Sequence, residues 1–445
     1  MDIKTLSAPF FAAATLSSLS YAATPYPAEL AGHAILPAQT FISPPADAPR
    51  DLNLSGKFSE GRRNNQAASM MGKSNGRETG ISFPFQGQPV QGHSGIKVMK
   101  DGSIWLLTDN GFGNKKNSTD SALFLRQYEV DWKNNRLTPQ KTIFLHDPDQ
   151  KAPLRIVHED TSQRYLTGGD FDPESLQFAN NRLWIGEEFG PHLLEFDLNG
   201  KLIAVHDTLV DGKTVHSPDY AKLTLPATPE ETTDFQVRRS KGFEGMAMSP
   251  DGGKLYPLLE GALWNQEQKT YEQLGNKHYL RILEFDTATR AYTGKSWKYV
   301  LENNDHAIGD FNMIDDQYGL IIERDNQEGT SAYPCGGKDT ARCFDKPAKF
   351  KRVYKVRLTD KGVAEKVGYI DLMNIGDPKK LAKKPLVNGR FVFPFFTIEN
   401  VDIVDKHHII VGNDNNLPFS SSREPNKADD NELILLDVGD FLKTN

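Results

Sequence analysis

The feature that most constrains this chain is a hairpin pattern that occurs five times. Each copy opens with small or acidic residues before one apolar stretch and closes with acidic or amide residues after the next. The openings lie at residues 92–96, 170–176, 242–246, 309–313 and 397–401, and the closings lie at residues 106–110, 185–189, 258–261, 322–326 and 411–415. Asp101-Gly102 and Asp251-Gly252 separate the two stretches of their copies and favour a tight turn. Repeated strand pairs of this kind predict a radial or stacked array of sheets.

The repeat predicts an all-β chain folded as a β-propeller. The copies recur at intervals of roughly 70–90 residues, which is long for one blade, so we expect long insertions between strands. Five copies and a poorly patterned segment over residues 23–80 suggest six blades, with seven as the alternative. We also expect a strand within residues 32–41 to close the ring by pairing with the last blade.

The first residues are typical of an export signal. Lys4 is followed by a moderately apolar stretch over residues 8–19, and Ser20-Tyr21-Ala22 suits cleavage after Ala22. We therefore expect a signal peptide at residues 1–22 and a single propeller domain at residues 23–445. No later stretch is long and apolar enough to span a bilayer, so no transmembrane anchor is expected. The expected location is the bacterial periplasm, with secretion as the alternative.

The remaining composition narrows the partners and cofactors. Cys335 and Cys343 are the two cysteines, and in an exported protein we expect them to form a local disulfide. The formal net charge of -7 and the lack of an arginine-rich stripe argue against a nucleic-acid partner. No Gly-x-Ser-x-Gly elbow is present, so a catalytic triad of the α/β-hydrolase kind has no support. No complete nucleotide-binding loop is present either, and we expect no organic cofactor. We expect a monomer.

The hairpin geometry gathers acidic side chains. The start of the first strand and the end of the second lie at the same end of an antiparallel hairpin. In a radial array the acidic residues would therefore meet at one mouth of the central channel. Their mutual repulsion would be relieved by a hard cation such as calcium. The alternative is that each carboxylate caps its own blade by accepting backbone N–H groups. The expected set is Asp109, Glu174, Glu188, Glu244, Glu260, Glu323, Glu399 and Asp414.

Position within the repeat divides this set into two groups. Glu174, Glu244 and Glu399 share the opening position. Glu188, Glu260 and Glu323 are expected to share the closing position. Ligands from separate blades would then face one another across the axis.

Several segments together resemble the phytase-like family, described as "esterase-like activity of phytase". They lie at residues 169–175, 187–191, 242–246, 260–261 and 413–416, and the resemblance extends over about residues 91–436. It implies a β-propeller, export and hydrolysis of phosphate esters.

We predict a calcium site that polarises a phosphate oxygen and generates a hydroxide nucleophile. The predicted metal ligands are Asp109, Glu174, Glu188, Glu244, Glu260, Glu399 and Asp414. The predicted catalytic residues are Glu174, Glu244, Glu323, Arg324 and His93. Arg324 could clamp a phosphate group, or it could pair with a neighbouring carboxylate. His93 could be an acid, a base or a ligand, or a hydrogen-bonded loop histidine. Weaker candidates are Lys241, His192 and Arg423.

The leading hypothesis is an exported, calcium-dependent hydrolase of small phosphate esters. One alternative is a lactonase or carboxylic esterase that uses the same acidic residues. The other is a periplasmic binding or scaffold propeller without catalytic activity.

Overall fold

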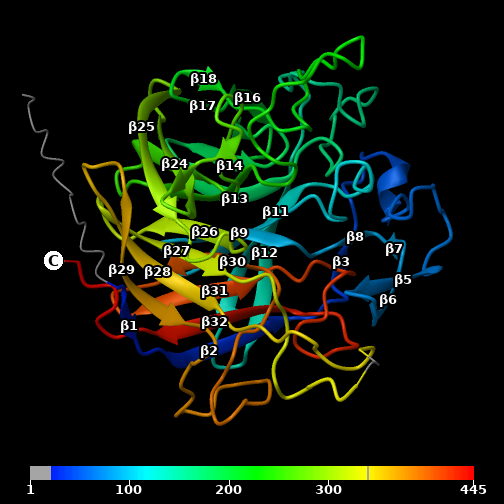
Figure 1. Ribbon diagram of the computed structural model, residues 1–445. Helices are drawn as coiled ribbons and strands as arrows, with labels where there is room; N and C mark the ends of the chain where they lie inside the picture. The colour runs from blue at the N-terminus through cyan, green and yellow to red at the C-terminus, as the bar shows by residue number, and fades with distance from the viewer. Residues whose placement is uncertain (1–21, 338–339, 445) are drawn as a thin grey trace, which may run out of the picture.

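The chain forms the predicted β-propeller, and it has five blades (Figure 1). A computed structural model describes residues 22–337 and 340–444. The first blade contains β9 (His93–Val98), β10 (Ile104–Thr108), β11 (Phe124–Asp131) and β12 (Arg136–Phe144). The second contains β13 (Pro173–Ala179), β14 (Arg182–Glu187), β15 (His192–Phe196) and β16 (Leu202–Asp207). The third contains β19 (Phe243–Met248), β20 (Lys254–Leu259), β24 (Lys277–Asp286) and β25 (Ala291–Val300).

The last two blades incorporate strands from the N-terminal segment. The fourth contains β26 (Ala307–Met313), β27 (Tyr318–Arg324), β28 (Lys351–Leu358) and β29 (Ala364–Asp371), with β1 (Thr24–Tyr26) added in parallel to β29. The fifth contains β30 (Ile398–Ile403), β31 (His408–Asn413), β32 (Asn431–Asp437) and β2 (Glu29–Leu36). Because β2 pairs antiparallel with β32, the N-terminal segment closes the ring, as predicted.

The expectation of six blades is wrong. The N-terminal segment supplies one strand to each of two blades that already exist, so it adds no blade of its own. Its remaining elements are the 3-10 helix η1 (Arg50–Asn53) and short paired strands. These are β3 (Phe41–Ile42) with β8 (Gln88–Pro89), β4 (Leu54–Ser55) with β7 (Phe85–Gln86), and β5 (Met70–Ser74) with β6 (Arg77–Phe83).

Apolar side chains fill the spaces between successive blades. Leu107 of the first blade and Leu183 of the second lie in one buried cluster, and Trp184 of the second and Met246 of the third lie in another. Further clusters join the third blade to the fourth, the fourth to the fifth and the fifth to the first. Both faces of each blade are therefore buried, which explains why the central strands have almost continuous apolar sequences.

The first strands of the blades surround the axis. β9, β13, β19, β26 and β30 are adjacent in that order, and β30 lies next to β9. The ends of these strands therefore lie close together, although they are far apart in the sequence.

Insertions carry the other short strands, β17 (Leu209–Val210) with β18 (Lys213–Thr214), β21 (Trp264–Asn265) with β22 (Thr270–Tyr271), and β23 (Gln273–Leu274). Cys335 and Cys343 form the predicted disulfide. Among the described residues, no helix has the length and apolar character needed to cross a membrane. The predicted signal peptide falls almost entirely on residues 1–21, which lie outside the described residues.

Candidate functional site

A β-bulge near the start of each inner strand directs side chains at the axis. In β13, β19 and β30 the pairing with the second strand of the blade skips Glu174, Glu244 and Glu399. A bulged residue leaves the ladder and its side chain is re-aimed. The bulges of β9 and β26 place Ser94 and Gly309 at the equivalent position. The three glutamates that share this position in the sequence therefore share it in space.

The second strand of each blade ends with another residue of the site. The backbone N–H groups of Asp109, Glu188 and Glu260 donate to the carbonyls of Gly92, Asp172 and Gly242, at 2.8, 3.0 and 2.8 Å. Each of these carbonyls lies two residues before the bulge position. In the fifth blade Thr397 Oγ1 donates to the carbonyl of Asp414, at 3.0 Å.

Glu323 does not occupy the expected closing position. Ala307, two residues before Gly309, pairs with Arg324, while Glu323 pairs with Ile308. Arg324 is therefore the counterpart of Glu188 and Glu260, and the expected alignment is wrong by one residue. Since alternate residues of a strand point to opposite faces, the carboxylate of Glu323 points away from the acidic residues.

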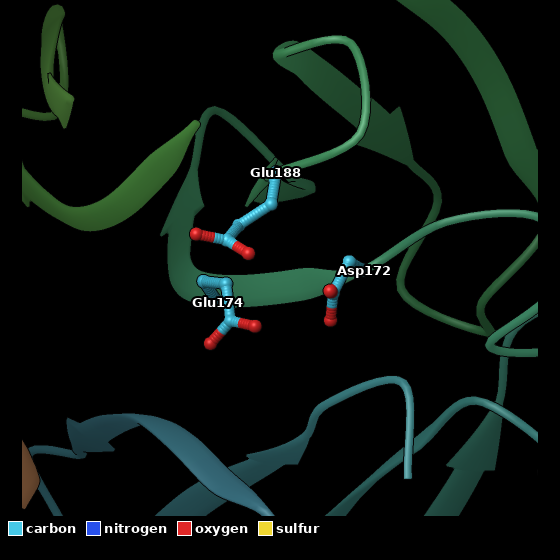
Figure 2. Close-up of side chains that lie close together, drawn as sticks. All are labelled: Asp172, Glu174 and Glu188. Carbon is cyan, nitrogen blue, oxygen red and sulfur yellow. The ribbon is translucent and has the colours of Figure 1, made fainter. Parts of the chain in front are cut away.

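Carboxylates from three blades meet at this end of the axis. Three groups each have oxygen atoms within 4.8 Å of one another: Asp172, Glu174 and Glu188; Glu174, Glu244 and Glu399; and Glu188, Glu244 and Glu260. Figure 2 shows Asp172 and Glu174 projecting from the start of β13 and Glu188 from the end of β14, around a common space. We call these residues, together with Asp109 and Asp414, the acidic cluster.

The acidic cluster is buried and electrostatically unfavourable when ionised. Burial, and then the charges of Asp172 and Glu244, raise the pKa of Glu174 well above its ordinary value. The pKa of Glu244 is also raised well above its ordinary value, first by burial and then by the charges of Glu260 and Glu399. Burial raises the pKa of Asp172 to about 7. Glu188, Asp109, Asp414 and Glu399 also have raised pKa values, with burial as the largest cause.

Arg324 and Lys241 bring positive charge to the acidic cluster. Arg324 Nη2 lies 3.1 Å from Glu399 Oε1, and Lys241 Nζ lies 2.5 Å from Glu260 Oε2. Burial lowers the pKa of Arg324, but the charges of Glu399, Glu260 and Glu244 outweigh it, so the net pKa is raised. Two cationic side chains cannot balance all of these carboxylates. The chemistry of the donors, all oxygen, suits a hard cation such as calcium.

The other predicted residues lie elsewhere. His93 is buried next to Arg126, and burial followed by that charge lowers its pKa to about 3, which opposes a role as a general acid. His192 Nδ1 lies 3.3 Å from Asp207. Arg423 pairs with Glu432 at 2.6 Å and donates to the carbonyl of Val392. His192 and Arg423 therefore have partners outside the acidic cluster, whereas Nδ1 of His93 is buried without a hydrogen-bond partner among the described residues.

Two further residues at this end of the axis, Asp172 and Ser94, were not among the predicted site residues. Asp172 accepts hydrogen bonds from the side chain and the backbone of Asn110, at 2.6 and 3.1 Å. Ser94 Oγ donates to Glu399 Oε2 at 3.1 Å. Both lie in the opening segments of the repeat, so aligning the openings residue by residue could have identified them.

Deeper along the axis, polar side chains fill the space between the inner strands. Asn312 accepts a hydrogen bond from Gln177 at 2.8 Å and donates to the carbonyl of Val401 at 2.8 Å. Lys97 Nζ lies 3.1 Å from Asp402. Each of these side chains is three residues beyond the bulge position of its strand. The axis is therefore filled with hydrogen-bonded side chains at this depth.

A cavity of about 460 Å³ adjoins the acidic cluster between the third and fourth blades. Its wall contains Glu260 of the acidic cluster and Lys241, the lysine that pairs with it. The wall also presents the positively charged or titratable groups of Arg238, His278 and His306. The cavity is large enough for a small ester whose reacting group faces the carboxylates.

The phytase-like family, described as "esterase-like activity of phytase", matches residues 88–417. The chain belongs to the phytase-like family. This match covers the first three blades completely, the fourth except for β1, and the first two strands of the fifth, so all residues of the acidic cluster lie within it. Membership confirms the resemblance found in the sequence.

One related protein matches a short segment of this phytase-like protein, and several solved structures match most of the chain at low sequence identity. An uncharacterized secreted protein of Arthroderma benhamiae is 28% identical over 135 residues, which are 27% of this chain and 25% of that protein. The chain thus spans about a quarter of that relative's length. A protein of unknown function from Dyadobacter fermentans has a TM-score of 0.38 at 12% identity, over 93% of this chain and 99% of that one. A periplasmic gluconolactonase of Pseudomonas aeruginosa has a TM-score of 0.31 at 14% identity, over 87% and 99%. At these TM-scores the structural likenesses carry no argument about function.

Proposed function

We propose that this phytase-like protein is an exported, calcium-dependent hydrolase of small phosphate esters. The observation that carries the proposal is the meeting of six carboxylates from three blades, in three overlapping groups, beside Arg324, Lys241 and a cavity. The similarity to a secreted fungal protein supports export.

The residues at the centre of the acidic cluster are the proposed cation ligands. Glu174, Glu188 and Glu244 each belong to two of the three groups, so each can share a cation with carboxylates of a neighbouring blade. Asp172, Glu260 and Glu399 complete the groups. Bound calcium would supply a Lewis acid for a phosphate oxygen and a water molecule of lowered pKa.

The cationic residues would bind the phosphate group. Arg324 offers a planar fork of donors that suits a phosphate, whereas Lys241 offers a compact point charge. Both are already next to carboxylates, so a phosphate would have to compete with Glu399 and Glu260 for them. Cation binding by these carboxylates would release the two side chains toward the substrate. We therefore expect calcium and phosphate ester to bind cooperatively.

Replacing Glu244 tests the metal site, because this residue links two groups. Glu244→Gln keeps the shape of the side chain and removes its charge. We expect the Kd for calcium, measured by isothermal titration calorimetry, to rise at least about 10-fold, and turnover of p-nitrophenyl phosphate and phytate to fall about 100-fold. Chelator should abolish turnover and added calcium should restore it. Glu129→Gln, on the exposed face of β11, is the control and should change neither quantity.

The other hypotheses correspond to different outcomes. Turnover that is indifferent to both chelation and Glu244→Gln would contradict the metal-dependent reaction. Turnover restricted to lactones or carboxylic esters would favour that class of hydrolase. Calcium binding without hydrolysis of any substrate in these panels would indicate a binding or scaffold protein.

A further inference from the structure

We propose that His306, positioned by Glu323, is a proton-transferring catalytic residue in the cavity beside the acidic cluster. The inference rests on the proposed function, because it assigns a step of ester hydrolysis to this cavity. It also assigns a positioning role to Glu323, which lies outside the acidic cluster.

The carboxylate of Glu323 is held by donors on every side. It accepts hydrogen bonds from Tyr299 Oη at 2.8 Å, Glu302 N at 2.7 Å, His306 Nδ1 at 2.8 Å and Lys366 Nζ at 2.6 Å. Its side chain is 0% exposed. Burial raises the pKa of Glu323, but the hydrogen bond from His306 and the charge of Lys366 outweigh it, so the net pKa lies below the ordinary value. Glu323 therefore stays ionised and fixed in place.

An ionised carboxylate only accepts hydrogen bonds, so Nδ1 of His306 must carry a proton. The ring also packs against Phe350, with 4.3 Å between the centroids. Its orientation is thus determined on two sides. Among the described residues, no group is hydrogen-bonded to Nε2, and the side chain, 10% exposed, lines the cavity. The second ring nitrogen is available to a substrate in the cavity.

Pairing with a carboxylate is not what distinguishes His306. His33, His192, His206 and His408 also lie next to carboxylates. None of these four lines the cavity that adjoins the acidic cluster. Among these five histidines, His306 is the one that combines a fixed tautomer with access to the cavity whose wall also contains Glu260 and Lys241.

The charges around the cavity set the conditions for proton transfer. The groups facing it from the neighbouring segments are Arg238, Lys241, Glu260, His278 and Asp305. The cationic groups attract an anionic ester into the cavity, where its leaving-group oxygen can approach Nε2 of His306. A general acid must stand within hydrogen-bond reach of that oxygen.

Hydrolysis of a phosphate monoester exchanges one P–O bond for another. The oxygen of a water molecule forms the new P–O bond, and the bond from phosphorus to the alcohol oxygen breaks. That oxygen keeps the electron pair of the broken bond and takes the proton from Nε2 of the His306 imidazolium. The proton lost by the water returns the imidazole to its protonated form, so the products are the alcohol and inorganic phosphate.

The test compares two esters that differ in their need for an acid. An alkyl phosphate such as glycerol phosphate has a poor leaving group that must be protonated, whereas p-nitrophenolate leaves without protonation. We expect His306→Gln to lower kcat by at least about 100-fold on glycerol phosphate and by less than about 10-fold on p-nitrophenyl phosphate. His206→Gln, a carboxylate-bound histidine outside the cavity, is the matched control and should leave both rates unchanged. Unchanged melting temperatures would show that both variants fold.

Glu323→Gln separates positioning from catalysis. Removing the carboxylate takes away the acceptor that fixes the ring, so we expect Glu323→Gln to lower kcat on glycerol phosphate at least about 10-fold, with KM nearly unchanged and a much smaller loss on p-nitrophenyl phosphate. If Glu323→Gln does not fold, His306→Ala with added imidazole replaces it, and imidazole should restore turnover of the alkyl ester.

The inference and the proposed function fail in different ways. Active wild-type protein with equal losses on the two esters in His306→Gln, or with no loss on either, would overturn the role of His306 and leave the metal site intact. Wild-type protein that hydrolyses neither phosphate would be tested with the corresponding alkyl and p-nitrophenyl carboxylic esters. Absence of turnover on all four would overturn the proposed function and this inference together.

Discussion

At the scale of single residues, Arg324 gives the acidic cluster its asymmetry. It stands in the fourth blade where the other blades have Asp109, Glu188, Glu260 and Asp414. Gly309, at the bulge position of the same blade, contributes no side chain. At these two positions the fourth blade therefore has a guanidinium and no carboxylate. This arrangement suits a phosphate that contacts Arg324 on one side and a cation held by the other blades on the other side.

Replacing Arg324 should separate phosphate binding from cation binding. Arg324→Gln removes the guanidinium, so we expect KM for p-nitrophenyl phosphate to rise about 10- to 100-fold. Calcium affinity, measured by calorimetry, should not fall, because a competing positive charge has been lost. Arg324→Lys keeps the charge but not the planar fork and should give an intermediate KM. An unchanged KM together with tighter calcium binding would mean that Arg324 serves only to balance charge.

Residue identity alone did not fix which side chains meet at the axis. The opening position was predictable, because Glu174, Glu244 and Glu399 stand at the same place in their repeats. The closing position of the fourth blade was not, since Glu323 and Arg324 are adjacent and a shift of one residue exchanges the two faces of the strand. His306 has no counterpart in the repeat, and only the packing of the blades shows that it reaches the cavity.

At the scale of elements, the bulges decide how closely the inner strands approach. A Cβ atom at Gly309 would lie 2.1 Å from the carbonyl oxygen of Ile398 and 3.1 Å from the Cα atom of Glu399. The backbone of β26 thus lies directly against β30 at the bulge. Glycine in this blade allows the contact that holds Glu399 beside Arg324.

Gly309→Ala should disturb this contact. The added methyl group meets backbone atoms, which cannot rotate away as a side chain could, so we expect a loss of about 1–3 kcal/mol in the free energy of unfolding. Urea denaturation followed by tryptophan fluorescence measures it. Gly336→Ala, where the added atom meets nothing within 4 Å, should leave the free energy nearly unchanged. Equal stability of the two variants would show that β26 can move away from β30 at no cost.

At the scale of the whole molecule, ring closure explains both what the sequence predicted and what it did not. A strand within residues 32–41 was expected to pair with the last blade, because propellers often close the ring with a strand from the N-terminal segment. The number of blades was overestimated, because residues 23–80 were counted as a blade of their own. Local patterns identify hairpins, but the blade that a distant strand joins depends on contacts between the two ends of the chain.

The closed ring also stores charge repulsion that depends on pH. The carboxyl groups of the acidic cluster with shifted pKa values have higher values folded than unfolded. The folded state therefore binds more protons, and the stability of the cation-free protein falls as pH rises through the folded values. For Asp172 this window runs from the ordinary value of 3.8 to about 7. Glu432, whose pKa is lowered from 4.5 to about 2, has the opposite sign, and its contribution is lost as pH falls from 4.5 to about 2.

We therefore expect chelated protein to melt at a temperature about 5 °C lower at pH 8 than at pH 5.5, measured by calorimetry. Calcium binds the ionised form, so an excess of calcium should raise the melting temperature at pH 8 and have little effect at pH 5.5. Sodium chloride at equal ionic strength is the control, since it screens buried charges poorly. Glu244→Gln should reduce both effects, because it removes one of the charges that repel. If chelated protein melts at the same temperature at the two pH values, the carboxylates are balanced by their existing partners, and their repulsion does not require a cation at the axis.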